Sequence, residues 1–277
     1  MPTIRDALRA AAARLDAAGV PDAANDAALL LAHLLGEQPL SLRADGARPL
    51  PEDTAAAYDA LVDRRAAREP LQYITGEAPF MGLMLEAAEN VLIPRFDTET
   101  LCGQALSRLQ GSMRALDLCT GSGAIAVALA HARPDAEVLA GDISPAALAL
   151  ARLNAASCGA RVDFRLGDLF APFSGERFDM IVSNPPYIPT GELPALQPEV
   201  RREPTLALDG GADGLAFYRR IAAEAPEHLA AGGWLGLEIG SDQAEAVCAL
   251  LAPAFEEISV YQDLNGLDRA VFGRKKP

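Results

Sequence analysis

Short apolar runs alternate with helical stretches between residues 112 and 273, and this alternation leaves few folds open to the chain. Five such runs are separated by helical segments or, after the third run, by a loop, and they lie at residues 115–118, 138–141, 162–166, 180–183 and 234–239. Strands that alternate with helices form a parallel sheet with both faces covered, because a parallel connection needs a long crossover. A doubly wound sheet is therefore expected.

Two further apolar runs, at residues 256–261 and 269–272, are separated by only a short turn. A short connection joins antiparallel neighbours, so these runs are expected to form a hairpin at one edge of the sheet. Half of the 277 residues are hydrophobic and 22% are charged, which is typical of a globular protein and excludes a disordered or collagen-like polymer. The sequence thus predicts an α/β fold with a seven-stranded doubly wound sheet in which one strand is antiparallel.

Residues 3–75 show an alanine-rich helical periodicity instead. Thr3 followed by Asp6 is typical of the start of a helix, and Gly19 is expected to end that helix. Asp22 and Gly36 bracket a second helix in the same way. A small helical domain is therefore predicted at the N-terminus.

A further amphipathic run covers residues 51–68. Ala57, Leu61 and Ala66 fall near one face of this run, which is expected to be buried. The basic pair Arg64-Arg65 is expected on a solvated face. This run completes the predicted helical domain.

Between residues 72 and 93, apolar residues such as Tyr73-Ile74 and Val91-Leu92-Ile93 are broken by glycine, proline and asparagine. Short apolar pieces between turn residues are typical of strands in a hairpin. We therefore expect a helical domain over residues 1–72, a β-hairpin linker over residues 73–95 and the sheet domain over residues 96–277.

The net charge of −14 argues against direct nucleic-acid binding, because like charge repels phosphates unless basic residues form a patch. Charged residues interrupt the first 20 positions, where a signal peptide is apolar, and no apolar run reaches the length of a membrane span. A cytoplasmic protein is expected, and its acidic surface and short tails favour a monomer. No C-x-x-C pair is present, so neither a metal site nor a disulfide framework is predicted from the cysteines at 102, 119, 158 and 248.

The loop after the first predicted strand indicates a ligand site, because ligands of doubly wound sheets bind beyond the carboxyl ends of the strands. Gly121 and Gly123 allow the backbone to approach a ligand, and the following helix offers free N–H groups. Asp142 ends the second predicted strand, where its carboxylate can accept both hydroxyls of a ribose. A nucleotide-like cofactor is indicated. The spacing Gly121-x-Gly123-x-x-Ala126 also matches, loosely, the fingerprint of a dinucleotide-dependent dehydrogenase.

The tetrapeptide Asn184-Pro185-Pro186-Tyr187 directly follows the fourth predicted strand and favours methylation of an amide or amine over hydride transfer. A planar amide nitrogen is a poor nucleophile, so an enzyme must hold it in line with the methyl donor. The Asn184 side-chain oxygen and a backbone carbonyl of the two prolines can each accept one N–H of a target NH2 group. Tyr187 can stack on the planar group. Positioning of this kind contributes several kcal/mol, up to roughly 7–11 in favourable cases.

Some of these residues also have simpler structural interpretations. Asp142 is a candidate N-cap for the helix that begins near Pro145. Cys119 is interpreted as a small packed residue, because no neighbouring lysine or histidine activates its thiol. Asp168 is either part of a turn or an acceptor for a purine amino group.

Several segments of the chain together resemble the release-factor glutamine methyltransferases, a family often called HemK or PrmC. They read REPLQYITG at residues 68–76, VLIPRFDTE at 91–99, DLCTGSGAIA at 117–126, IVSNPPYIP at 181–189, REP with LALDGG at 202–211 and DLNGLDR at 263–269. The resemblance runs from the helical domain to the last strand. It implies a sheet domain of the S-adenosylmethionine-dependent methyltransferase type, preceded by a small helical substrate-recognition domain.

The resemblance further implies methylation of the glutamine in the Gly-Gly-Gln motif of peptide chain release factors, with S-adenosylmethionine as donor and S-adenosylhomocysteine as product. The implied donor contacts are Cys119, Thr120, Gly121, Ser122, Gly123, Asp142, Leu169 and Asn184. The implied catalytic residues, which hold the glutamine, are Asn184, Pro185, Pro186 and Tyr187. The helical domain and the segment after Pro189 would bind the release factor. Cys119 stands where the family usually has a glycine, Phe96 where it has a proline, and Leu169 where some members have an aromatic residue.

Two other functions stay open at this point. A DNA adenine N-methyltransferase faces the same chemical problem at an exocyclic amine, but it needs a basic DNA-binding face and an element that recognises the flipped base. A non-catalytic subunit that only binds the donor is the other alternative, and an intact Asn-Pro-Pro-Tyr sequence argues against it.

Overall fold

The computed structural model describes residues 1–277, and the chain divides into two compact units. One comprises Met1–Gly76 and Gln197–Arg202, and the other comprises Glu77–Leu196 and Glu203–Pro277. The chain therefore first crosses from the smaller to the larger unit after Gly76, whereas the sequence placed the end of the helical domain at Gln72. Residues 77–95 of the expected linker belong to the larger unit.

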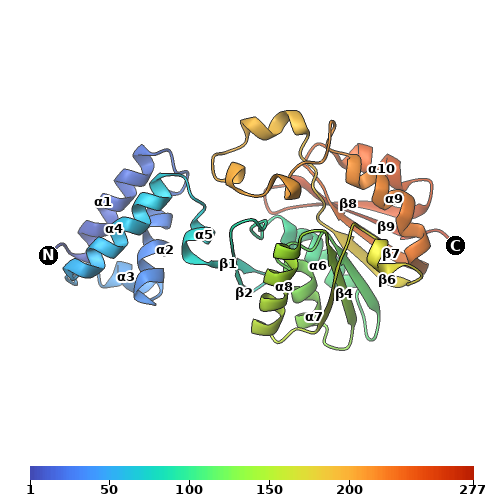
Figure 1. Ribbon diagram of the computed structural model, residues 1–277, viewed down its shortest axis with the longest axis horizontal. Helices are drawn as coiled ribbons and strands as arrows, with labels where there is room; N and C mark the ends of the chain where they lie inside the picture. Colours follow the sequence, from blue (N-terminus) through green and yellow to red (C-terminus); the bar gives the residue numbers. More distant parts are fainter. The chain divides into compact units, whose positions relative to one another are not determined.

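The smaller unit is helical (Figure 1). Its helices are α1 (Ile4–Ala17), α2 (Ala23–Leu35), α3 (Pro39–Ala44), α4 (Glu52–Ala66) and α5 (Leu71–Thr75). The expected start of α1 is confirmed as a full capping box, because the Thr3 hydroxyl accepts a hydrogen bond from the Asp6 N–H while the Asp6 carboxylate accepts one from the Thr3 N–H. Gly36 ends α2 in the left-handed conformation, with φ of 64°, as its position predicts.

The buried face of α4 differs from the predicted one. The side chains that α4 buries are Tyr58, Val62 and Arg65. Ala57 is exposed, and Leu61 and Ala66 are only partly buried. A tyrosine and a valine remove more apolar surface from water than alanines do, so the helix turns toward these larger residues.

The prediction that Arg65 lies on a solvated face is wrong, because its side chain is only 5% exposed. Its guanidinium donates to Asp26 at 2.7 Å and to Glu199 at 2.9 Å, and Arg68 donates to both oxygens of Glu199 at 2.6 Å. Burial raises the pKa of Asp26. Burial also acts to raise the pKa of Glu199, but hydrogen bonds from Arg68 and Arg65 outweigh it and lower this pKa to about 2. These ion pairs hold the segment Gln197–Arg202 in the helical unit.

Replacement of Arg65 by methionine is expected to lower the free energy of unfolding of the helical unit by about 3–5 kcal/mol, because Asp26 loses its only partner in a buried site. Urea denaturation followed by far-UV circular dichroism measures the change. Arg14→Met is the matched control, since Arg14 pairs with Asp59 and Asp63 while 41% of its side chain is exposed, and its effect should be far smaller. Equal denaturation midpoints for Arg65→Met and the unchanged protein would contradict the structural role of this cluster.

The larger unit begins with the two-stranded hairpin of β1 (Glu77–Phe80) and β2 (Leu83–Glu86). Its other strands are β3 (Arg114–Leu118), β4 (Glu137–Asp142), β5 (Val162–Leu166), β6 (Phe178–Ser183), β7 (Leu229–Glu238), β8 (Phe255–Gln262) and β9 (Asp268–Lys275). Its helices are α6 (Thr98–Arg108), α7 (Ala124–Ala132), α8 (Pro145–Ser157), α9 (Ala216–His228) and α10 (Ala244–Leu251). Four short 3-10 helices are η1 (Ala171–Phe173), η2 (Thr190–Ala195), η3 (Val200–Arg202), which lies in the helical unit, and η4 (Thr205–Ala207).

The predicted seven-stranded doubly wound sheet is confirmed, with the strand order β5-β4-β3-β6-β7-β9-β8. β9 pairs antiparallel with both β7 and β8, and the other pairs are parallel. β3 connects to β4 on one side and has β6 on its other side, so the strand order reverses at β3. This reversal is the topological switch point where doubly wound sheets bind ligands.

Helices cover both faces of this sheet (Figure 1). Successive side chains of β3 point to opposite faces: Ala115 packs in the core formed with α6 and α7, and Leu116 and Leu118 pack in the core formed with α9 and α10. Both cores exclude water from the central strands, which explains the nearly continuous apolar runs in the sequence. No helix of residues 1–277 combines the length and the apolar character needed to span a membrane.

The hairpin forms only part of the segment in which strands were expected. Tyr73-Ile74 lies in helix α5, which begins after Pro70 and ends at Gly76 with φ of 75°. A proline before a helix and a left-handed glycine after it are ordinary helix boundaries, so the turn residues here mark a short helix. Val91-Leu92-Ile93 forms no strand, and Val91 and Leu92 instead line a cavity.

Candidate functional site

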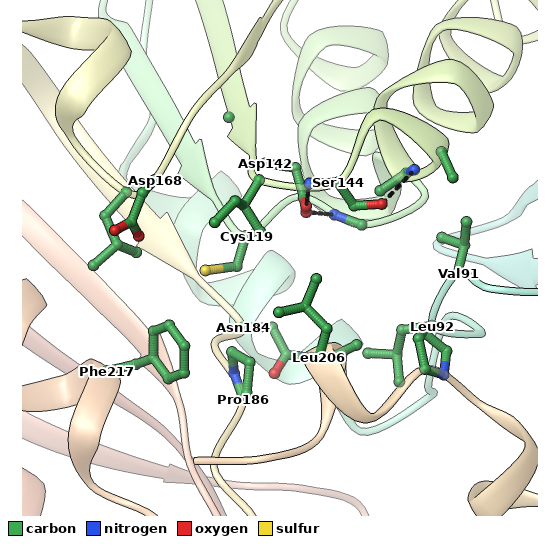
Figure 2. A pocket seen from close by; sticks show the side chains of 18 of the residues that line it. Val91, Leu92, Cys119, Asp142, Ser144, Asp168, Asn184, Pro186, Leu206 and Phe217 are labelled. Atoms are coloured by element: carbon green, nitrogen blue, oxygen red, sulfur yellow. Dashed lines mark hydrogen bonds between the residues drawn. The ribbon is translucent and has the colours of Figure 1, made fainter. Parts of the chain in front are cut away.

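A cavity of about 400 Å³ opens beyond the carboxyl ends of three neighbouring strands. Its volume lies in the range of small-molecule sites, roughly 300–1,000 Å³. The loop after β3 contributes Cys119 and Gly121, the end of β4 contributes Gly141 and Asp142, and the loop after β6 contributes Asn184 and Pro186. Figure 2 shows Asp142, Ser144 and Cys119 on one side of this cavity and Asn184, Pro186 and Leu206 on the other. The structure thus brings the glycine loop and the Asn-Pro-Pro-Tyr segment to one cavity, at the switch point of the sheet.

The glycine loop turns sharply through left-handed backbone conformations. The φ angles of Cys119, Gly121 and Gly123 are 56°, 55° and 80°. A Cβ atom on Gly121 would have open space around it, whereas one on Gly123 would lie 2.9 Å from the Cβ atom of Ala151. Gly123 is therefore required for close packing of α7 on α8 as well as for its backbone angle, and it does not line the cavity.

Cys119 takes a left-handed conformation that L-residues other than asparagine and aspartate adopt rarely. Its side chain lines the cavity. Burial raises the pKa of the Cys119 thiol to about 12, and the nearby Asp142 acts in the same direction. The thiol is therefore neutral at physiological pH, in agreement with its interpretation as a packed residue.

The Asp117 carboxylate binds the glycine loop and the first turn of α7 through hydrogen bonds. Its Oδ2 atom accepts a hydrogen bond from the Thr120 hydroxyl at 2.6 Å and one from the Ala126 N–H at 3.2 Å. Thr120 and Ser122 are consequently buried and do not line the cavity. Burial raises the pKa of Asp117 to about 7, although the bonds from Thr120 and Ala126 oppose this shift.

The Asp142 carboxylate is held in place by two backbone amides. Gly121 N–H donates to Oδ2 and Ser144 N–H donates to Oδ1, each at 2.8 Å. The interpretation of Asp142 as a helix N-cap is wrong, because Ser144 occupies the N-cap position of α8 and accepts from the Ala147 N–H at 3.3 Å. Burial raises the pKa of Asp142, and its backbone hydrogen bonds oppose the rise. A carboxylate offers about four lone-pair sites, so Asp142 can accept further hydrogen bonds in the cavity.

Leu169 lines the cavity together with Asp168 and Phe217, the last two of which are labelled in Figure 2. The Asp168 carboxylate accepts a hydrogen bond from the Arg220 guanidinium at 2.7 Å. Arg220 and Phe217 come from α9 and were not predicted as site residues. No local pattern in the sequence marks them as part of a cavity.

The four residues of the Asn-Pro-Pro-Tyr segment take different positions. Asn184 and Pro186 line the cavity, whereas Pro185 and Tyr187 do not. The Asn184 Nδ2 atom donates to the Thr98 hydroxyl at 3.2 Å, so its amide hydrogens face α6. The Tyr187 hydroxyl lies 3.5 Å from Glu238 Oε1, and its backbone carbonyl accepts from Gln243 at 3.0 Å.

One wall of the cavity joins two segments that are distant in the sequence. Residues 90–92 and residues 204–207 both contribute to it, and the sequence marked neither of them as part of a pocket. Glu203 connects these segments, because its carboxylate accepts from the Ile93 N–H at 3.0 Å and pairs with Arg95. Apart from Asn90, these residues lie in the stretches 91–99 and 202–211 that resemble the methyltransferase family, and this resemblance is the signal that could have identified them. Phe96 is 71% exposed and does not line this wall.

Two family models cover much of the chain. The PrmC N-terminal domain matches residues 6–76. The methyltransferase small domain matches residues 86–195, which include the glycine loop, Asp142 and the Asn-Pro-Pro-Tyr segment.

Solved structures support the fold of the larger unit. A methyltransferase from Pyrococcus furiosus superposes with a TM-score of 0.56 at 17% identity, covering 80% of this chain and 100% of that protein. A 16S rRNA N2 G1207 methyltransferase from T. thermophilus, solved with AdoMet and guanosine, has a TM-score of 0.54 at 19% identity and covers 72% of this chain and 50% of its own. The sheet is therefore of the type found in these methyltransferases.

Curated relatives match over nearly the full length. The release factor glutamine methyltransferase of Geobacter sulfurreducens is 48% identical over 98% of this chain and 96% of its own. The proteins of the same name from Cereibacter sphaeroides and Deinococcus radiodurans are 48% and 45% identical over 97% and 98% of this chain, and over 97% and 98% of their own. With identity this high across both units, the chain belongs to the release factor glutamine methyltransferase family.

Proposed function

We propose that this chain transfers a methyl group from S-adenosylmethionine to the side-chain amide nitrogen of the glutamine in the Gly-Gly-Gln motif of peptide chain release factors. The observation that carries the proposal is the placement of Asn184 and Pro186 in the same cavity as Asp142 and the glycine loop. One part of this cavity offers acceptors for a nucleoside, and another part offers acceptors for an amide. The names of the relatives supply the substrate.

The residues of the cavity fit the methyl donor. Asp142 presents a fixed carboxylate for the ribose hydroxyls, and Gly121 leaves open space above the loop. Leu169 and Leu206 give apolar contact for a planar base. When bound, the donor supplies an electrophilic methyl group on a sulfonium. The product is S-adenosylhomocysteine.

Asn184 performs the positioning step. Its Nδ2 atom is directed to Thr98, so Oδ1 remains as the acceptor for one N–H of the glutamine amide. A backbone carbonyl of Pro185-Pro186 accepts the second N–H. With both hydrogens held, the glutamine nitrogen forms its new bond to the methyl carbon with its lone pair, while the electrons of the carbon–sulfur bond pass to sulfur. The nitrogen then loses one proton to solvent, which balances the step.

The helical unit and the segment after Pro189 are proposed as the contact regions for the release factor. We also propose that the protein acts as a cytoplasmic monomer and does not bind nucleic acid directly. The net charge of −14 supports this, because an acidic surface repels nucleic acid and suits a protein substrate with basic regions.

Incubation of the purified protein with S-adenosylmethionine and a release factor from the same organism tests the proposed reaction. Tandem mass spectrometry should locate one added methyl group on the glutamine of the Gly-Gly-Gln motif. A release factor in which this glutamine is replaced by alanine is the matched control and should gain none. Methylation of adenine in added DNA, with no methyl on the release factor, would overturn the proposed function.

A further inference from the structure

A buried chain of polar side chains extends from Asn184 away from the cavity. Asn184 Nδ2 donates to the Thr98 hydroxyl at 3.2 Å, and the Thr98 hydroxyl in turn lies beside the carboxyl group of Glu238. The exposed fractions of Thr98 and Glu238 are only 4% and 1%. The Tyr187 hydroxyl reaches the same carboxyl group, 3.5 Å from Oε1. The other carboxyl oxygen of Glu238, Oε2, is buried and has no further hydrogen-bond partner.

The chemistry of these groups fixes the donor and acceptor of each hydrogen bond from Asn184 through Thr98 to Glu238. A threonine hydroxyl has a single proton to donate, and here its oxygen accepts a hydrogen bond from the Asn184 amide. An ionised carboxylate only accepts hydrogen bonds, so the Thr98 hydroxyl donates its hydrogen bond to Glu238 and receives none from it. The Thr98 oxygen is then an acceptor toward Asn184. In this arrangement the NH2 group of Asn184 faces Thr98 and its oxygen is left for the cavity.

We propose that Glu238 acts through Thr98 as a positioning residue that holds the Asn184 carboxamide with its oxygen toward the target amide. Neither side chain touches the substrate. Without an acceptor-only group at the end of the chain, the Thr98 proton is free to turn to Asn184 and to stabilise the carboxamide in the reversed orientation. A reversed carboxamide presents hydrogens to the NH2 group of the target and cannot hold it. This inference rests on the proposed function.

The surroundings of Glu238 place its titration near neutral pH. Burial raises the pKa of Glu238 to about 7, and the charge of Asp97 acts in the same direction. The Thr98 and Tyr187 hydroxyls and the charge of Arg269 on β9 oppose this rise in the pKa. The Tyr218 hydroxyl on α9 binds the backbone carbonyl of Glu238 at 2.8 Å. The carboxylate that orients Asn184 is therefore lost as the pH falls below about 7. Turnover should fall with it.

Thr98→Val and Thr98→Ser test the inference with methyl transfer to the release factor. Valine keeps the shape of the side chain and removes the hydroxyl. We expect kcat to fall about tenfold or more, because a tenfold loss corresponds to the free energy of about one lost hydrogen bond. The affinity for S-adenosylhomocysteine, measured by calorimetry, should stay within about twofold, because Thr98 does not line the cavity. Serine restores the hydroxyl and should recover most of the turnover. A Thr98→Val protein with unchanged kcat and pH profile would overturn the inference.

Glu238→Gln supplies a readout that a purely structural role would not change. Glutamine has nearly the same size but does not titrate, so the fall in kcat on the acidic side of pH 7 should disappear and kcat at pH 8 should be reduced. Retention of the fall with an unchanged midpoint would show that another group causes it and that Glu238 does not orient Asn184.

Neutron diffraction of the deuterium-exchanged protein at pH 8 separates this inference from the proposed function. The Thr98 deuteron should point to Glu238, and the Asn184 oxygen should face the cavity, whichever substrate the enzyme uses. A deuteron directed to Asn184 would overturn the inference. Absence of methyl transfer by the unchanged protein, with the expected deuteron position, would overturn the proposed function alone.

Discussion

Replacement of Asn184 by alanine is expected to lower the rate of methyl transfer to the release factor by about 100-fold or more. The alanine side chain has no acceptor for the target amide, so the nitrogen is no longer held in line with the methyl group, and a misplacement of about 1 Å costs roughly that factor. The effect should appear in kcat, measured with both substrates saturating. Affinity for S-adenosylhomocysteine should change only slightly, because Asp142 and the glycine loop stay in place.

Asn265→Ala is the matched control for this experiment. Asn265 lies in the exposed turn between β8 and β9, where its backbone N–H binds the Asp263 carboxylate. Its side chain does not line the cavity, so turnover should equal that of the unchanged protein. If Asn184→Ala were as active as Asn265→Ala, the proposed role of Asn184 would be wrong.

Replacement of Asp142 by alanine should produce the second large effect, this time on donor binding. The Asp142 carboxylate is fixed by Gly121 and Ser144 and is proposed to accept the ribose hydroxyls. Loss of two hydrogen bonds to a charged group, at about 1.5 kcal/mol each, corresponds to a roughly 100-fold rise in the dissociation constant. Calorimetry with S-adenosylhomocysteine measures this directly, without the release factor.

Asp168→Asn serves as the comparison for Asp142, because it changes a second carboxylate on the same cavity. The Asp168 carboxylate already accepts a hydrogen bond from Arg220. Loss of the Asp168 charge should therefore weaken donor binding much less than loss of Asp142 does. A larger loss of affinity in Asp168→Asn than in Asp142→Ala would contradict the proposed donor site and point to recognition through Asp168.

Residues that follow a strand directly in the sequence could be predicted as neighbours. Asp142 and Asn184 each come at or just after the end of an apolar run, and parallel strands place such ends along one edge of the sheet. The glycine loop could be located for the same reason. Tyr187 shows the limit of this argument: it is adjacent to Pro186 in the chain, yet its hydroxyl points to Glu238 and its side chain does not line the cavity.

Side-chain contacts between distant segments could not be predicted where the strand order does not dictate them. Arg65 contacts Glu199 at a separation of 134 residues, and Thr98 contacts Asn184 at a separation of 86. A helical pattern distinguishes apolar from polar faces, but it does not show that a charged residue has a buried partner elsewhere. The burial of Arg65 and the link from Asn184 to Glu238 therefore appear only when the chain is folded.

Local sequence patterns were enough to predict the seven-stranded sheet, the helical N-terminal region and the type of chemistry that the Asn-Pro-Pro-Tyr segment supports. These depend on periodicity, turn residues and local caps, which are properties of neighbouring residues. The folded chain was needed to show which side chains line the cavity, how residues 90–92 and 204–207 form one wall, and which groups contact Asn184. Packing and hydrogen bonding between distant segments depend on the position of every element in space, and no local pattern contains that information.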